Sequence, residues 1–152
     1  MKKSTCVYLI RDGKWLMLLR NRKKNDVNHG KWIGVGGKCE GQESYEDCAV
    51  REVREETGLN AEELIPAGIL LFEYEGKEPE EIAVFVCRRF SGTMRECDEG
   101  TLAWIDEDQI LSLQLWEGDR IFLEQMLSGS VDPFRIRLCY DRADHLIKSE
   151  PC

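Results

Sequence analysis

Five of the six glutamates in the stretch from Gly37 to Leu59, which reads GKCEGQESYEDCAVREVREETGL, lie close together around a pattern that should be a helix. They are Glu43, Glu46, Glu52, Glu55 and Glu56. Carboxylates spaced three or four residues apart repel one another on a helix, at a cost of roughly 0.2–0.5 kcal/mol per pair. Either a bound cation offsets this repulsion, or the acidic face of the helix is fully solvated.

The spacing of three of these glutamates indicates a metal site. Glu52, Glu55 and Glu56 fall on one patch of a helix, and an oxygen-only donor set favours a hard cation such as Mg²⁺ or Mn²⁺. A glycine-rich segment ends at Gly37, and Lys38 follows with a charge that can meet a phosphate. Because Mg²⁺ is commonly shared between carboxylates and substrate phosphates, the combination predicts phosphoanhydride chemistry. A solvated acidic face is the alternative at this point.

The acidic stretch is expected to form a helix over residues 44–57. Ser44 is a good N-cap residue, and Gly58 suits the position that follows the last turn. A helical wheel places the three glutamates on a face of their own. A separate, core-facing side is predicted from three apolar residues, Ala49, Val50 and Val53.

The remaining pattern is mostly that of short strands. They are expected at 5–10, 15–19, 31–37, 64–74, 82–90, 102–105, 134–140 and 145–148. Asp12-Gly13 is a strong hairpin signal between the first two. A second helix is expected over 116–127. With no internal repeat or linker, this order predicts one α+β domain over residues 1–152, built on a mixed sheet.

Composition excludes several classes of partner. The net charge of −8 argues against a nucleic-acid polymer, whose binding usually needs a basic face. A small phosphorylated ligand remains compatible, since bound cations and a few local Lys and Arg residues can reach it. No apolar run has the ~20 residues of a membrane helix, and no signal peptide is recognisable, so a cytoplasmic protein without membrane contact is expected. The seven Cys form no CxxC pair, which argues against a zinc site.

One motif in this stretch resembles a known family. Gly37, five residues, Glu43, seven residues and then REVREETGL (Arg51–Leu59) match the signature of the Nudix hydrolases at every defined position. The resemblance implies an α/β/α sandwich with a mixed sheet and a characteristic loop and helix. It also implies metal-dependent hydrolysis of a nucleoside diphosphate linked to another group.

The resemblance further implies a role for each signature residue. The implied metal ligands are the carbonyl of Gly37 and the carboxylates of Glu52, Glu55 and Glu56. Glu43 and Arg51 would form an ion pair that holds the loop against the helix, and Arg51 would join the catalytic residues by orienting Glu52. The base that removes a proton from the attacking water is left open among Glu52, Glu56 and Glu99.

Beyond the signature, most of the chain is similar to the MutT-type subgroup, which hydrolyses oxidised purine nucleoside triphosphates. GKWIGVGGK (30–38), GILLFEYEG (68–76) and DEGTLAWIDEDQI (98–110) carry this similarity. The base-binding residues that it implies are Tyr8, Ile33, Phe72, Trp116 and Asp119. Trp116 would stack on a purine or else pack in the core. Asp119 would contact the purine edge or else only complement a helix dipole.

Phosphate binding has two candidates, Lys38 beside the glycines and Lys23 in the basic loop RNRKK, for which solvated surface charge is the alternative. Two positions depart from the mammalian pattern of the subgroup. Ile33 stands where those enzymes carry a base-reading Asn, and Gly118 replaces one of two aspartates. A pocket that lacks a polar partner discriminates less, so several nucleoside triphosphates are expected as substrates.

The leading expectation is therefore a metal-dependent pyrophosphohydrolase that cleaves purine nucleoside triphosphates such as 8-oxo-dGTP to the monophosphate and pyrophosphate. Its role would be sanitation of the nucleotide pool, in support of DNA repair. One alternative is a hydrolase of ADP-ribose, a nucleotide sugar or a pterin triphosphate. Another is a nucleotide-binding module without activity, although such a module would be expected to lose signature carboxylates, and none is lost here. The oligomeric state is left open.

Overall fold

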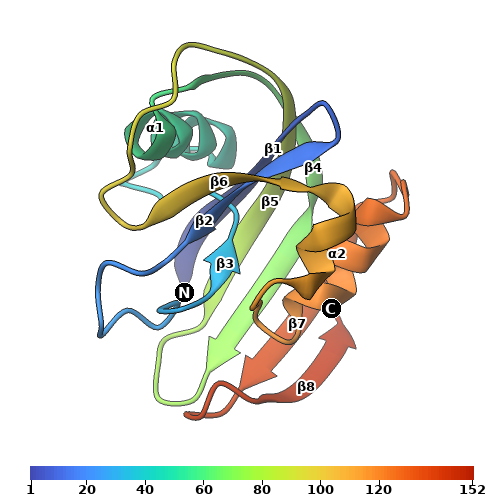
Figure 1. Ribbon diagram of the computed structural model, residues 1–152. Coiled ribbons are helices and arrows are strands. Elements are labelled where there is room, and N and C mark those ends of the chain that lie inside the picture. The colour runs from blue at the N-terminus through green and yellow to red at the C-terminus, as the bar shows by residue number, and fades with distance from the viewer.

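A mixed eight-stranded sheet separates the two α-helices in the computed structural model, which describes residues 1–152 (Figure 1). The elements are β1 (Lys2–Arg11), β2 (Lys14–Leu19), β3 (Trp32–Ile33), α1 (Tyr45–Thr57), β4 (Asn60–Tyr74), β5 (Glu80–Ser91), β6 (Thr101–Asp106), the 3₁₀ helix η1 (Glu107–Ser112), α2 (Asp119–Leu127), β7 (Phe134–Tyr140) and β8 (Leu146–Pro151). The strand order is β3-β2-β1-β5-β4-β7-β8, and β6 pairs with β2. The pairs β1–β5 and β4–β7 are parallel and the others antiparallel, which confirms the predicted mixed sheet and α/β/α sandwich.

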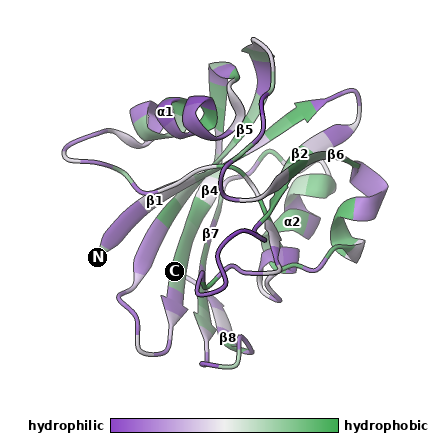
Figure 2. Ribbon diagram, turned by 60° about the vertical axis from the view of Figure 1, so that its left-hand side comes forward, coloured by the Kyte–Doolittle hydropathy of each residue, from purple (hydrophilic) through white to green (hydrophobic).

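Each face of the sheet has its own hydrophobic core. Successive side chains of β1 alternate between the faces, so Val7 and Leu9 join the core beneath α1, while Tyr8 and Ile10 join the core beneath α2. Figure 2 shows hydrophobic stretches along the central strands and a mixture of hydrophilic and hydrophobic residues along α1. The central strands are therefore covered on both faces.

The acidic helix α1 has the predicted ends. The Ser44 hydroxyl accepts a hydrogen bond from the Asp47 amide at 3.1 Å. Gly58 ends the helix at φ 80°, a left-handed conformation that Gly adopts at little cost, and its amide donates to the Arg54 carbonyl. Neither α1 nor α2 has the length and apolar character that crossing a membrane requires.

The predicted division of α1 into a core face and an acidic face is partly wrong. Ala49 and Val53 are fully buried, but Val50 is 41% exposed because it lies at the edge of the buried stripe. Glu56 is buried instead. It lies seven residues after Ala49 and three after Val53, and these spacings place it on their side of the helix.

Several predicted boundaries also differ. The hairpin at Asp12-Gly13 is confirmed, with φ of 53° and 72° at these two residues. The strand expected from residue 64 begins at Asn60, and the strand expected over 31–37 is reduced to β3. The helix expected over 116–127 begins only at Asp119, so Trp116 precedes it in the connection from η1.

Candidate active site

Two of the three clustered glutamates are withdrawn from solvent. Glu56 is only 6% exposed, and its Oε1 accepts a hydrogen bond from the Gly36 amide at 2.7 Å. Burial raises the pKa of Glu56 to about 8, and the negative charges of Glu99 and Glu52 add to this effect. Burial also raises the pKa of Glu52, whereas the Glu55 side chain is 58% exposed. A fully solvated acidic face is therefore wrong for Glu52 and Glu56.

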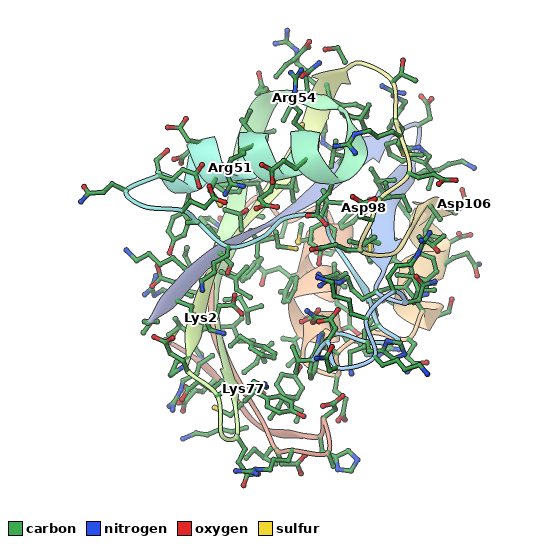
Figure 3. All side chains as sticks on the ribbon, turned by 90° about the vertical axis from the view of Figure 1, so that its left-hand side faces the viewer. Lys2, Arg51, Arg54, Lys77, Asp98 and Asp106 are labelled. Carbon is green, nitrogen blue, oxygen red and sulfur yellow. The ribbon has the colours of Figure 1, made fainter.

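Arg51 connects the loop before α1 to the helical carboxylates. Its guanidinium donates to both carboxylate oxygens of Glu43, at 2.7 and 2.9 Å, so the predicted ion pair is present. The same group donates to Glu52 at 2.8 Å, to Glu55 at 3.1 Å and to the Lys38 carbonyl at 3.0 Å. Figure 3 shows Arg51 on the side of α1 that faces the loop. Hydrogen bonds from Arg51 lower the pKa of Glu43 to about 2.

Gly37 lies directly against the Glu52 carboxylate. A Cβ at position 37 would be 2.6 Å from Glu52 Oε2, so any other residue there would push the Glu52 carboxylate out of this position. The Gly37 carbonyl accepts a hydrogen bond from the Thr5 amide at 2.9 Å, and longer contacts of 3.5 Å from the Thr5 hydroxyl and the Cys48 thiol.

The chemistry of these groups fits a hard divalent cation, since the donors are oxygens and the carboxylates repel one another. With Arg51 bound to Glu52 and Glu55, no three Asp, Glu, His or Cys side chains converge on a single point. The roles of Gly37, Glu52, Glu55 and Glu56 as metal ligands remain predictions.

Arg20 belongs to the site, although the sequence pattern did not distinguish it from the other basic residues of its loop. Its Nη1 lies 3.4 Å from Glu99 Oε2, and its Nε lies 2.9 Å from Asp26 Oδ2. The side chain is 16% exposed, and its positive charge opposes the rise in the pKa of Glu56. Glu99 is therefore tethered beside the buried carboxylates. No local pattern reveals this, because Arg, Asp and Glu are ordinary residues of an exposed loop.

One pocket joins the glycine segment to an aromatic wall. The predicted base-binding residues all line it, namely Tyr8, Ile33, Phe72, Trp116 and Asp119. Arg20, Gly36, Gly37 and Lys38 also line it. The two glycines contact the carboxylates from behind, since Gly36 donates to Glu56 and Gly37 lies against Glu52. Lys23 is exposed and does not line the pocket, so of the two predicted phosphate-binding lysines only Lys38 is placed there.

Trp116 serves both the core and the pocket. It is 3% exposed, its ring packs edge-to-face with Phe72 and Tyr140, and its Nε1 donates to Asn28 Oδ1 at 2.8 Å. Trp116, Phe72 and Asn28 line the pocket. The core packing considered for Trp116 is therefore confirmed, and its contact with a purine stays a prediction.

Asp119 is a nearly buried acid whose carboxylate makes no hydrogen bond within the protein. It is 7% exposed, lies in the first turn of α2 and lines the pocket. Burial alone raises the pKa of Asp119 to about 7. Because buried polar groups normally have partners, a ligand that donates hydrogen bonds would complete this environment.

Comparison with known proteins agrees with this geometry. The NUDIX domain family model matches residues 2–126. The chain belongs to the Nudix family. Among the relatives of this Nudix chain, the oxidized purine nucleoside triphosphate hydrolase of Danio rerio is 34% identical over 124 residues, which cover 81% of this chain and 78% of that protein. The Mus musculus protein of the same name is 34% identical over 111 residues, with 72% and 71% covered.

Solved structures agree as well. The mutator MutT protein from Bacillus halodurans matches this Nudix chain with a TM-score of 0.88 and 25% sequence identity, over 99% of this chain and 97% of that one. The resemblance seen in the signature is thereby confirmed, and with it the Nudix fold. Strands β7 and β8 lie beyond the segment that the family model matches.

The placement of Arg20 in the Nudix pocket gives a testable prediction. Arg20→Met removes a positive charge that the phosphates of a bound nucleotide would meet, and it breaks the contact between Arg20 and Glu99. We expect the KM for a nucleoside triphosphate to rise about tenfold, the size typical of a lost contact to a charged group. Arg22→Met is the matched control, since Arg22 is exposed in the same loop and does not line the pocket. Equal KM values for the two variants would contradict a specific role for Arg20.

Proposed function

We propose that this Nudix chain is a divalent-metal-dependent pyrophosphohydrolase of purine nucleoside triphosphates, including oxidised ones such as 8-oxo-dGTP, and that it acts in sanitation of the nucleotide pool. The observation that carries the proposal is the single pocket that joins Gly37 and Lys38, beside the buried carboxylates, to Asp119 on the aromatic wall. If the phosphates of a nucleotide bind at the glycine end of the pocket, its base lies at the aromatic end. The names of the relatives in zebrafish and mouse support the same substrate class.

The carboxylate end would carry out the hydrolysis. Mg²⁺ or Mn²⁺ held by Glu52, Glu55, Glu56 and the Gly37 carbonyl would neutralise phosphate charge and make a bound water more acidic. Arg51 orients Glu52, and the Gly36 amide fixes one oxygen of Glu56. Glu56, Glu52 or Glu99 would take the proton from the attacking water, and Lys38 would bind a phosphate.

The aromatic end would select the base. Trp116 and Phe72 offer ring surface on which a purine can stack, and the unpaired Asp119 carboxylate can accept hydrogen bonds from the purine edge. Ile33 lines the same pocket without a polar group. Discrimination between bases would therefore depend mainly on Asp119, and ordinary purine triphosphates are expected to compete with the oxidised ones.

Asp119→Asn tests the base end through both binding and stability. The pKa of Asp119 is raised from 3.8 to about 7, so the folded state holds a proton that the unfolded state releases, and wild-type stability falls as the pH rises from about 4 to 7. The variant should lack this fall. At pH 8 it should be more stable than the wild type by at least about 1.4 kcal/mol, the equivalent of one pKa unit.

The same variant should raise the KM for purine triphosphates about tenfold, because an amide cannot replace a carboxylate acceptor at every donor of the base. Urea denaturation at pH 5 and pH 8 and steady-state kinetics measure the two effects. Asp108→Asn, a change at an exposed acid of η1, is the control. An unchanged KM together with an unchanged pH dependence of stability would exclude this role for Asp119.

Product analysis tests the proposed reaction. The protein is incubated with 8-oxo-dGTP and Mg²⁺ in ¹⁸O-labelled water, with a parallel sample in excess chelator. We expect 8-oxo-dGMP and pyrophosphate, with turnover lost in the chelator. Release of inorganic phosphate would contradict the assignment of the cleaved bond. Tight binding without turnover in Mg²⁺ or Mn²⁺ would favour a binding module.

A further inference from the structure

The turn between β7 and β8 contacts residues that pack against the pocket-lining Trp116, although it lies beyond the segment shared with the Nudix family model. Figure 1 shows this turn at the same end of the sheet as the connection from β4 to β5. Asp141 closes the turn by accepting hydrogen bonds from the amides of Ala143 and His145, at 2.8 and 3.0 Å. Asp144 has φ 64°, a left-handed conformation in which Asp is several-fold enriched.

The two oxygens of Asp144 have different partners. Lys31 Nζ lies 2.5 Å from Oδ2, and the Tyr74 hydroxyl donates to Oδ1 at 2.6 Å. The Lys31 side chain is only 10% exposed, so its ammonium group depends on this carboxylate as its counter-charge.

Both partners of Asp144 contact Trp116. Lys31 Nζ lies 4.1 Å from the centroid of the indole ring, in a cation–π contact. The ring of Tyr74 packs edge-to-face with the same indole, with 6.1 Å between the ring centroids. Neither Lys31, Tyr74 nor Asp144 lines the pocket. They therefore support Trp116 from outside the space in which a ligand would lie.

A second contact fixes the turn beside Trp116. The Glu117 carboxylate accepts a hydrogen bond from the Leu146 amide at 3.0 Å. The Gly118 amide donates to the hydroxyl of Tyr140 on β7 at 2.8 Å. The residues that follow Trp116 are thus held by the same hairpin that presents Asp144.

We propose that the β7–β8 turn sets the position of Trp116 through the Lys31–Asp144 pair, which makes Lys31 and Asp144 positioning residues for the nucleobase. This inference rests on the proposed function, in which the base occupies the pocket lined by Trp116. If Asp144 loses its charge, the Lys31 ammonium is left buried without a counter-charge and moves toward solvent. The indole then loses the cation that covers it, while Tyr74 keeps the Arg142 carbonyl as an acceptor at 3.0 Å.

Asp144→Asn tests the position of Trp116 directly. The protein is labelled with 5-fluorotryptophan, and the ¹⁹F resonance of Trp116 is assigned with Trp116→Phe. We expect the Trp116 resonance to shift in Asp144→Asn and to stay in place in Glu150→Gln. The latter makes the same chemical change in the same hairpin, at a carboxylate that pairs with Arg137 and Lys148 instead. A Trp116 resonance that moves no further in Asp144→Asn than in the control overturns the proposal.

Kinetics test the consequence for the base. Asp144→Asn should raise the KM for a purine triphosphate about tenfold, the coupling typical of contacting residues, and leave kcat within about twofold. Lys31→Met should do the same. Because each change breaks the same pair, the double variant should show the larger single effect rather than the product of the two.

Independent, multiplying effects on KM would contradict the proposal, as would a fall in kcat at constant KM. If Asp144→Asn does not fold, both the ¹⁹F spectrum and the kinetics are measured on Lys31→Met. A wild-type protein that hydrolyses no nucleotide would refute the proposed function, while the ¹⁹F shift would still decide whether the turn positions Trp116.

Discussion

Glu56→Gln is expected to lower kcat about a thousandfold without unfolding the protein. Glu56 is the most deeply buried carboxylate of α1, and its position is fixed by the Gly36 amide, which lines the pocket. Glutamine keeps an acceptor for that amide but loses both the negative charge and the ability to take a proton. Loss of a positioned acid or base typically costs 10²–10⁴-fold in rate, and a lost metal ligand would act in the same direction.

The fold should tolerate this change, since glutamine has the shape of glutamate and keeps the oxygen that accepts from the Gly36 amide. Measurement of kcat at saturating Mg²⁺ and of thermal unfolding separates the two effects. Glu46→Gln, at an exposed acid in the first turn of the same helix, controls for a general loss of helical charge. Unchanged turnover in Glu56→Gln would exclude the carboxylate cluster as the hydrolytic centre.

Arg51→Met is expected to affect both stability and turnover. The guanidinium is the only basic group that bonds to Glu43, Glu52 and Glu55 together, so its loss leaves three acids without a counter-charge. We expect Tm to fall by about 5 °C, which is the shift that a destabilisation of about one to two kcal/mol causes in a domain of this size. Turnover should also fall, because Glu52 is no longer oriented.

The ion pair makes an additional prediction about acid stability. The pKa of Glu43 is lowered from 4.5 to about 2, so the pair stabilises the fold above pH 4.5, and this contribution is lost as the pH falls toward 2. Arg51→Met and Glu43→Gln should each weaken that dependence, and the double variant should not weaken it further. Arg54→Met, a change on the same helix at a residue that pairs with Asn60 rather than an acid, is the control. A Tm and an acid dependence like those of wild type would show that Arg51 does not hold the loop.

The parts of the site that are local in sequence were predictable. The resemblance of the Gly37–Leu59 stretch to the Nudix signature implied the Glu43–Arg51 ion pair, and the capping residues Ser44 and Gly58 marked both ends of α1. These features depend on helix geometry and on side chains a few residues apart. The strand order was expected only as a class, because pairing depends on contacts between distant segments.

The parts that depend on such contacts were missed or assigned wrongly. The burial of Glu56 contradicts a separate acidic face. The polarity of its side chain predicted exposure to solvent, whereas its position on the helix places it beside Ala49 and Val53. The tether of Arg20 to Glu99 joins two loops. Lys31 and Asp144 are 113 residues apart, so no local pattern connects them.

The measurement that tests the central claim most directly is the rate of pyrophosphate release, with Mg²⁺, from 8-oxo-dGTP, dGTP and dATP in parallel. Hydrolysis of ADP-ribose is followed beside it through the monophosphate products. The proposed function predicts rapid release from the purine triphosphates, with kcat/KM highest for 8-oxo-dGTP, and little cleavage of ADP-ribose. A preference for ADP-ribose would contradict the triphosphate assignment and leave only the Nudix hydrolase chemistry. Equal values for 8-oxo-dGTP and dGTP would contradict a role in sanitation of the nucleotide pool.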